Sequence, residues 1–237
     1  MKKLLIITAL LLLIFGCKKN EEKFTLNVIV ENGSQHSSKI DMVYAKTIGP
    51  LQSTPETIAE VSYGNGTFTF ELPGTIEDKF LFPIENSILP GAKDIKISNK
   101  NAKIAVIALF AEKDGKHVGN ILRSSFDQSM VLQWQNPEIL EILKDTYATG
   151  AYGTTYIYAN KPVTITGTSI VTELQGYEIN NPYTYTYNLK LTKGWNKYTT
   201  KSTGTWENMF LKDVTMEVTN TEPTGMKWYL LGGLGKN

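Results

Sequence analysis

Residues 183–191 read YTYTYNLKL, and this stretch sets the expectation for the whole fold. Every odd-numbered position holds tyrosine or leucine, and every even-numbered position holds threonine, asparagine or lysine. Because successive side chains of a β-strand point to opposite faces, the alternation gathers the tyrosines and leucines on one face. The stretch therefore predicts a strand with one face in a core and the other in water.

The same two-residue period recurs along most of the chain. Residues 24–31 read FTLNVIVE, and residues 68–72 place two phenylalanines and a leucine at every second position. The Gly-Asn-Gly sequence at 64–66 accepts positive φ, so it predicts a hairpin turn just before 68–72. Further strands are predicted, in chain order, at Ile40, Met42 and Tyr44, at Ala59–Tyr63, Tyr156–Tyr158, Val163–Ile165, Val214–Val218 and Met226–Leu230.

One strand should be central. Residues 104–111 read IAVIALFA, with no polar member, so both faces of this strand should be covered. The polar, glycine-containing residues 112–116 predict a turn, and 118–122 predict the return strand. Short connections between successive strands favour antiparallel neighbours that close into a sandwich.

One short helix interrupts the strands. Asn136 can cap it, Pro137 suits its first position, and Glu138 suits the positive end of its dipole. The polar residues 145–153, with two glycines, predict an irregular linker after it. We therefore predict an all-β chain with two antiparallel β-sandwich domains joined by one short helix. The predicted division is a sandwich at 24–135, helix and linker at 136–153, and a second sandwich at 154–237; the alternative makes the helix and linker part of one larger domain.

The N-terminus predicts export. Lys2 and Lys3 precede twelve apolar residues at 4–15, the pattern of a secretory signal peptide. As a helix that run would cover roughly 18 Å, too short for the ~30 Å core of a bilayer. We predict a signal peptide at 1–16 that is cleaved, and a polar tether at 17–23.

Residues 14–17 (IFGC) resemble the lipobox of bacterial lipoproteins. The resemblance implies that Cys17 is diacylated and anchors the chain in a membrane. Lys18 stands where the inner-membrane retention signal of enteric bacteria carries aspartate, which implies the outer membrane, on its periplasmic or its surface side. The alternative is an ordinary secreted protein with one unmodified cysteine.

Two C-terminal stretches resemble uncharacterised β-rich lipoproteins of Bacteroides-type bacteria. They are 188–197 (NLKLTKGWNK) and 158–167 (YANKPVTITG). The resemblance implies a family and a location in the cell envelope, and it transfers no catalytic residue. Gly194 permits a tight turn in the first stretch, and Trp195 can close the end of a sandwich.

Composition and motifs exclude several functions. Removing Lys2 and Lys3 leaves 22 basic and 23 acidic residues, a balance that predicts no nucleic-acid binding. The single cysteine excludes an intramolecular disulfide, and His36 and His117 stand too far apart in sequence to predict a metal site. Nucleophile-elbow, P-loop and dinucleotide-binding motifs are absent from the sequence. We predict no catalytic residues, no metal and no cofactor.

Aromatic residues remain as candidate binding groups. Exposed rings on a β surface can stack on sugars, and we select Tyr147, Tyr152, Trp195 and Trp206. Trp206 should be the most exposed, because 202–208 (STGTWEN) reads as a turn. The tyrosines of 183–187 and Trp228 should instead fill the core. The prediction is a lipid-anchored, non-enzymatic binding or accessory protein whose partner is a glycan or an outer-membrane protein; the alternative is a fimbrial or other surface-assembly subunit.

Overall fold

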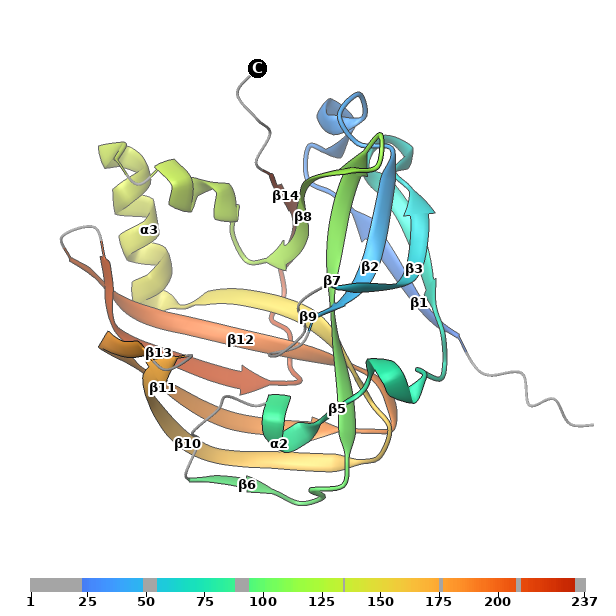
Figure 1. The fold of residues 1–237 in the computed structure, drawn as a ribbon. Coiled ribbons are helices and arrows are strands. Elements are labelled where there is room, and N and C mark those ends of the chain that lie inside the picture. Colours follow the sequence, from blue (N-terminus) through green and yellow to red (C-terminus); the bar gives the residue numbers. More distant parts are fainter. Residues whose placement is uncertain are drawn as a thin grey trace, which may run out of the picture.

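The computed structural model describes residues 23–48, 55–87, 94–133, 135–174, 177–207 and 210–232. The chain folds as an all-β protein with one sizeable helix, as predicted. Figure 1 shows a curved layer built from β10–β13, a second group formed by β1–β3, and β7 running from one to the other.

The strands are β1 (Phe24–Ile29), β2 (Met42–Ile48), β3 (Glu56–Ser62), β4 (Thr67–Leu72), β5 (Phe82–Pro83), β6 (Ile95–Ile97), β7 (Lys103–Lys113), β8 (Lys116–Ser124), β9 (Ala151–Ala159), β10 (Val163–Leu174), β11 (Tyr177–Leu191), β12 (Gly194–Glu207), β13 (Phe210–Thr219) and β14 (Lys227–Leu231). The α-helices are α2 (Ile84–Ser87) and α3 (Pro137–Thr149), and the 3₁₀ helices are η1 (Gly33–His36), η2 (Gly64–Gly66), η3 (Asp78–Phe80) and η4 (Gln128–Gln133).

Among the described residues, twelve strands form one sheet, and β1 and β4 pair as a separate two-stranded sheet. The main path is β3-β2-β7-β8-β9-β12-β13-β11-β10-β6, with β14 beside β8 and β5 beside β7. Neighbours are antiparallel except β11 and β13, which run parallel. β11 and β12 diverge from the turn at Thr192–Lys193, and β13 lies between them. Asn220 joins the three strands there, because its side chain accepts from Lys190 N at 2.6 Å and donates to Lys197 O at 3.0 Å.

The first core lies between the β1–β4 pair and the main sheet. Leu26 and Val28 of β1 and Phe68, Phe70 and Leu72 of β4 are buried, which confirms both predicted alternations. They pack against buried residues of β2, β7 and β8 and against Trp228. Sandwiching two sheets face to face in this way removes the apolar side of each from water.

The second core lies inside the curved layer. Tyr187, Leu189 and Leu191 are buried there with Ile165 and with Ile84 of α2. The stretch 183–191 therefore faces inward as predicted, although Tyr183 and Tyr185 at its beginning are only partly buried. Burial of the Tyr187 ring raises the pKa of its hydroxyl well above the ordinary value, so this side chain stays neutral.

The strand predicted around Met42 and Tyr44 is present as β2. Its buried side chains are Val43, Ala45 and Thr47, whereas Met42 and Tyr44 lie on its other face and are partly buried. Tyr44 is accommodated there because Lys46 Nζ lies 4.9 Å from the centre of its ring, so an aromatic side chain covers the outside of the sheet.

The predicted linker at 145–153 is not irregular. α3 continues to Thr149, and β9 begins at Ala151, so Gly150 alone separates them. The hydroxyls of Thr146 and Thr149 donate to the carbonyls of Ile142 and Asp145 within the helix. Polar residues that predicted a loop thus bond to the helix backbone, and packing of α3 on β12 fixes the helical state.

The main sheet crosses the predicted domain junction. β9 pairs with β7 and β8 on the N-terminal side and with β12 on the C-terminal side. The two cores lie mostly in the two predicted halves, but hydrogen-bonded strands connect them. Division into two domains at 24–135 and 154–237 stays a prediction.

The predicted signal peptide at 1–16, Cys17 and most of the tether at 17–23 lie outside the described residues. In the part of the chain that is described, none of the helices has the length and apolarity needed to cross a membrane.

Candidate binding cavity

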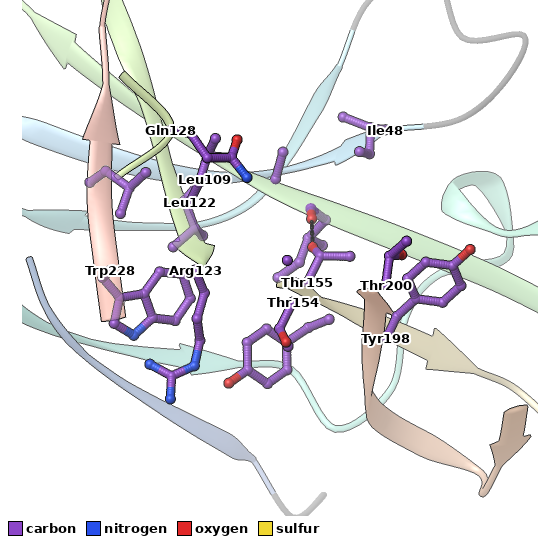
Figure 2. A pocket seen from close by; sticks show the side chains of 15 residues that line it. Ile48, Leu109, Leu122, Arg123, Gln128, Thr154, Thr155, Tyr198, Thr200 and Trp228 are labelled. Carbon is purple, nitrogen blue, oxygen red and sulfur yellow. Dashed lines mark hydrogen bonds between the residues drawn. The ribbon is translucent and has the colours of Figure 1, made fainter. Parts of the chain in front are cut away.

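A candidate site lies where the main sheet forks. β7 pairs with β9 from Ile104 to Ile107 and with β8 from Leu109 onward. β8 and β9 pair only at Arg123 and Ser124. The three strands therefore part around Ala108 and leave a cavity of about 270 Å³, which we call the fork cavity (Figure 2).

Most of the lining is apolar. β7 and β8 supply Ile107, Leu109, Ile121 and Leu122. Three aromatic residues, Tyr156, Tyr198 and Trp228, also line it. The Tyr156 and Trp228 rings stack on each other with their centres 6.5 Å apart, so one end of the cavity is a rigid aromatic wall.

Two of the five hydroxyl groups that line the fork cavity, those of Thr154 and Thr155, are hydrogen-bonded inside the protein. Thr155 Oγ1 donates to Ile107 O at 2.6 Å, at the point where the β7 ladder changes partner. Thr154 Oγ1 lies 2.9 Å from Thr199 Oγ1, and both side chains are buried. Burial raises the pKa of the Tyr198 hydroxyl to about 12, so it stays neutral at physiological pH. Thr154 and Thr155 therefore present little unused polarity, whereas the hydroxyls of Tyr156, Tyr198 and Thr200 make no hydrogen bond to a described residue and can face a ligand.

Gln128 adds an amide group to the lining of the fork cavity. Figure 2 shows its side-chain amide at the upper edge of the cavity in this view, beside Leu109 and Leu122. Its Nε2 makes one long contact of 3.5 Å, to Ser124 Oγ. A primary amide offers two donors and an acceptor, so Gln128 can hydrogen-bond a polar group of a bound molecule.

Three charged side chains form a cluster beside the aromatic end of the fork cavity. Glu222, whose side chain is 4% exposed, pairs with Arg123 Nε through one carboxylate oxygen and lies against Lys197 Nζ through the other. The Arg123 guanidinium also lies 5.5 Å from the Trp228 ring. Glu222 offsets part of the Arg123 charge, and Arg123 is the one charged residue among those that line the cavity, so the lining suits an uncharged molecule.

The four aromatic residues selected from the sequence do not form one site. Trp195 donates from Nε1 to Pro73 O at 2.8 Å and meets the Tyr158 ring edge to face, so it packs where two core clusters meet. Tyr147 and Trp206 do meet, with ring centres 5.9 Å apart. Tyr152 lies apart from them and lines a separate groove of about 220 Å³.

Trp206 is not in a turn. Strand β12 continues to Glu207, and Trp206 pairs with Leu211 of β13. Its ring is partly buried against Tyr147, which α3 carries and which in turn contacts Phe126. Glycine at 204 suggested a turn, but it sits at an irregularity where β13 takes an extra residue and the pairing resumes.

The fork cavity itself was missed from the sequence. Ile107 and Leu109 belong to a stretch that predicts only a covered strand, and the exchange of partners at Ala108 has no local signature. Gly153 is the one hint, because a glycine inside a strand often marks close approach or open space beside the backbone.

Within the described residues, histidines, cysteines and acidic side chains form no group of three that could hold a metal. His117 is exposed on β8, and its Nε2 lies 3.1 Å from Asn120 Oδ1. His36 lies in η1, where burial and Lys39 lower its pKa.

Comparison of the chain with family models, with curated proteins and with solved structures finds no match. The fork cavity, the outer surface and the sequence signals are therefore the features that bear on its function.

Proposed function

We propose that this chain is a lipid-anchored, non-enzymatic protein of the bacterial outer membrane that binds a small, uncharged and mainly apolar molecule in the fork cavity. The observation that carries the proposal is a cavity of about 270 Å³ with an apolar and aromatic lining. Ligand sites combine such linings with a few polar groups that orient the ligand, and Gln128 is placed for that role.

The membrane anchor rests on the sequence. Acylation at Cys17 would insert at least two chains, and two chains hold a protein on a membrane where one binds only marginally. Mass spectrometry of Cys17 in protein extracted from cells should find the thiol acylated. Replacing Cys17 with serine should release the protein from the membrane fraction, and an unmodified thiol would refute the anchor without touching the cavity.

Binding can be tested with N-phenyl-1-naphthylamine, an uncharged apolar dye whose emission rises in apolar surroundings. A shortened chain that begins at Lys18 contains every described element and, without the lipidation site Cys17, avoids detergent micelles. We expect saturable enhancement at one site per chain. Gly153→Leu, which directs a side chain into the cavity, should weaken dye binding at least tenfold.

Gly64→Leu is the matched control, because a side chain built at Gly64 would meet no atom within 4 Å and Gly64 does not line the cavity. It should bind the dye as the parent does. Equal binding by all three proteins would show that the dye binds elsewhere and would reject the cavity as the site.

A further inference from the structure

A second pocket lies on the outer face of the curved layer. Neighbouring strands β9, β12 and β13 place Tyr152, Lys201 and Glu217 directly opposite one another across the sheet. Together with Thr219, Thr221 and Pro223 they line a groove of about 220 Å³, which we call the outer groove. The hydrogen-bonded pair Thr154 and Thr199 separates it from the fork cavity, because Thr154 lines the cavity and Thr199 lines the groove.

The two charged side chains of the outer groove do not neutralise each other. Lys201 and Glu217 face each other on adjacent strands, where opposite charges commonly pair. Within the described residues no ion pair joins them; Lys201 Nζ instead lies 5.9 Å from the centre of the Tyr152 ring. Glu217 is exposed and makes no hydrogen bond to a described residue. The groove thus holds a strong donor and a strong acceptor side by side, with Glu217 exposed and Lys201 partly exposed.

The remaining groups define what fits between them. Thr219 Oγ1 is used inside the protein, donating to Thr221 O at 3.3 Å. Thr221 is exposed, so its own hydroxyl can face a ligand. Tyr152 adds a flat ring beside these polar groups, and the ring is partly accessible. An aromatic surface beside hydrogen-bonding groups suits a molecule with an apolar face and polar edges.

From this arrangement we infer that the outer groove binds a neutral sugar residue. Adjacent hydroxyls of a sugar both donate and accept, so they can bond Glu217 and Lys201 at once, while the C–H face of the ring lies on Tyr152. A phosphate or carboxylate ligand is disfavoured because Glu217 would repel it. A cationic ligand is disfavoured by Lys201 in the same way.

Affinity electrophoresis of the full chain in non-ionic detergent tests this inference, with dextran, laminarin and mannan as immobilised neutral polysaccharides. We expect retardation in at least one gel. Lys201→Met and Glu217→Gln keep the size of a partly exposed and of an exposed side chain, so both variants should fold. Each should weaken retardation at least fivefold.

Gly153→Leu separates the two sites. It fills the fork cavity and should leave retardation unchanged, so loss of dye binding and loss of glycan binding can be told apart. Absence of retardation in all three gels, or equal retardation of the parent and the Lys201→Met, Glu217→Gln double variant, would overturn the inference.

Discussion

The substitution Gly153→Leu tests whether the fork cavity is empty. It should raise the free energy of unfolding if the leucine fills empty space, and lower it if the fork is already packed. Gly153 lies in β9 and does not adopt a positive φ, so a side chain can be added without backbone strain. The nearest atom to a Cβ built there is Gln128 Nε2, 4.0 Å away. The cavity of about 270 Å³ is larger than a leucine side chain.

The expected gain follows from these values. Burying a leucine side chain fully contributes about 1.5 to 3 kcal/mol, and a cavity open on one side should yield roughly half of that. Replacing glycine in a strand adds about 0.5 to 1 kcal/mol through the entropy of the unfolded chain. Gly153→Leu should therefore stabilise the protein by about 2 kcal/mol.

Urea unfolding followed by tryptophan fluorescence measures this difference, with unchanged m-value as the check that both proteins unfold alike. Thermal unfolding should shift upward by about 4 to 8 °C. Gly64→Leu, at the open site, should stay within about 0.5 kcal/mol of the parent. If the fork is packed, leucine at 153 would instead destabilise by about 1 to 3 kcal/mol, and that sign would refute the reasoning.

Three further predictions concern the framework around the site. Thr154→Val or Thr199→Val leaves one buried hydroxyl without its partner, so each should cost about 1 to 2 kcal/mol in urea unfolding, and the double variant should cost no more than one of them; additive costs would show that the two hydroxyls do not interact. Burial raises the pKa of Tyr63, whose hydroxyl donates to Gly33 O at 3.0 Å, to about 12. The side chain of the unfolded protein ionises near pH 10. The contribution of Tyr63 to the free energy of unfolding is therefore complete below pH 10, and it falls by about 1.4 kcal/mol per pH unit as the pH rises toward 12. Tyr63→Phe should be less stable than the parent by about 1 kcal/mol at pH 8 and no less stable above about pH 11, and a difference independent of pH would contradict this. Asn220→Ala removes the side chain that joins β11 and β12 and should cost about 1 to 3 kcal/mol in unfolding measurements, whereas a change below about 0.5 kcal/mol would show that the strands need no such bridge.

The strands that the sequence predicts best are those whose burial is decided locally. Phe68, Phe70 and Leu72 alternate with polar residues after a Gly-Asn-Gly turn, and the structure buries all three. Asn136 likewise caps α3 as expected, accepting from Glu138 N at 3.0 Å. In these places side-chain period and backbone preference favour the same structure.

Predictions failed where distant segments decide the structure. Trp206 stands in a polar, glycine-containing stretch, but pairing with β13 keeps that stretch extended. Near the end of α3, Tyr147 contacts Phe126, which lies between β8 and η4, and Trp206 of β12. Contacts of this kind depend on the arrangement of strands, which a period of two residues does not encode.

The two candidate sites also depend on contacts between segments that are distant in the sequence. Tyr152 was selected as an aromatic residue, and it does line the outer groove. Its neighbours Lys201 and Glu217 are brought to it only by strand register, so the sequence alone does not group them. The fork cavity depends on β7 exchanging β9 for β8 within one strand, a property of the sheet as a whole.

The central claim is that the fork cavity binds a small apolar molecule. Its most direct test is an NMR titration of the isotope-labelled chain that begins at Lys18 with N-phenyl-1-naphthylamine. The account predicts that amide shifts change around Ile107, Leu109 and Ile121, and that the same signals stay unchanged in Gly153→Leu. Shift changes confined to other parts of the protein, or an identical response in Gly153→Leu, would contradict the fork cavity as the binding site.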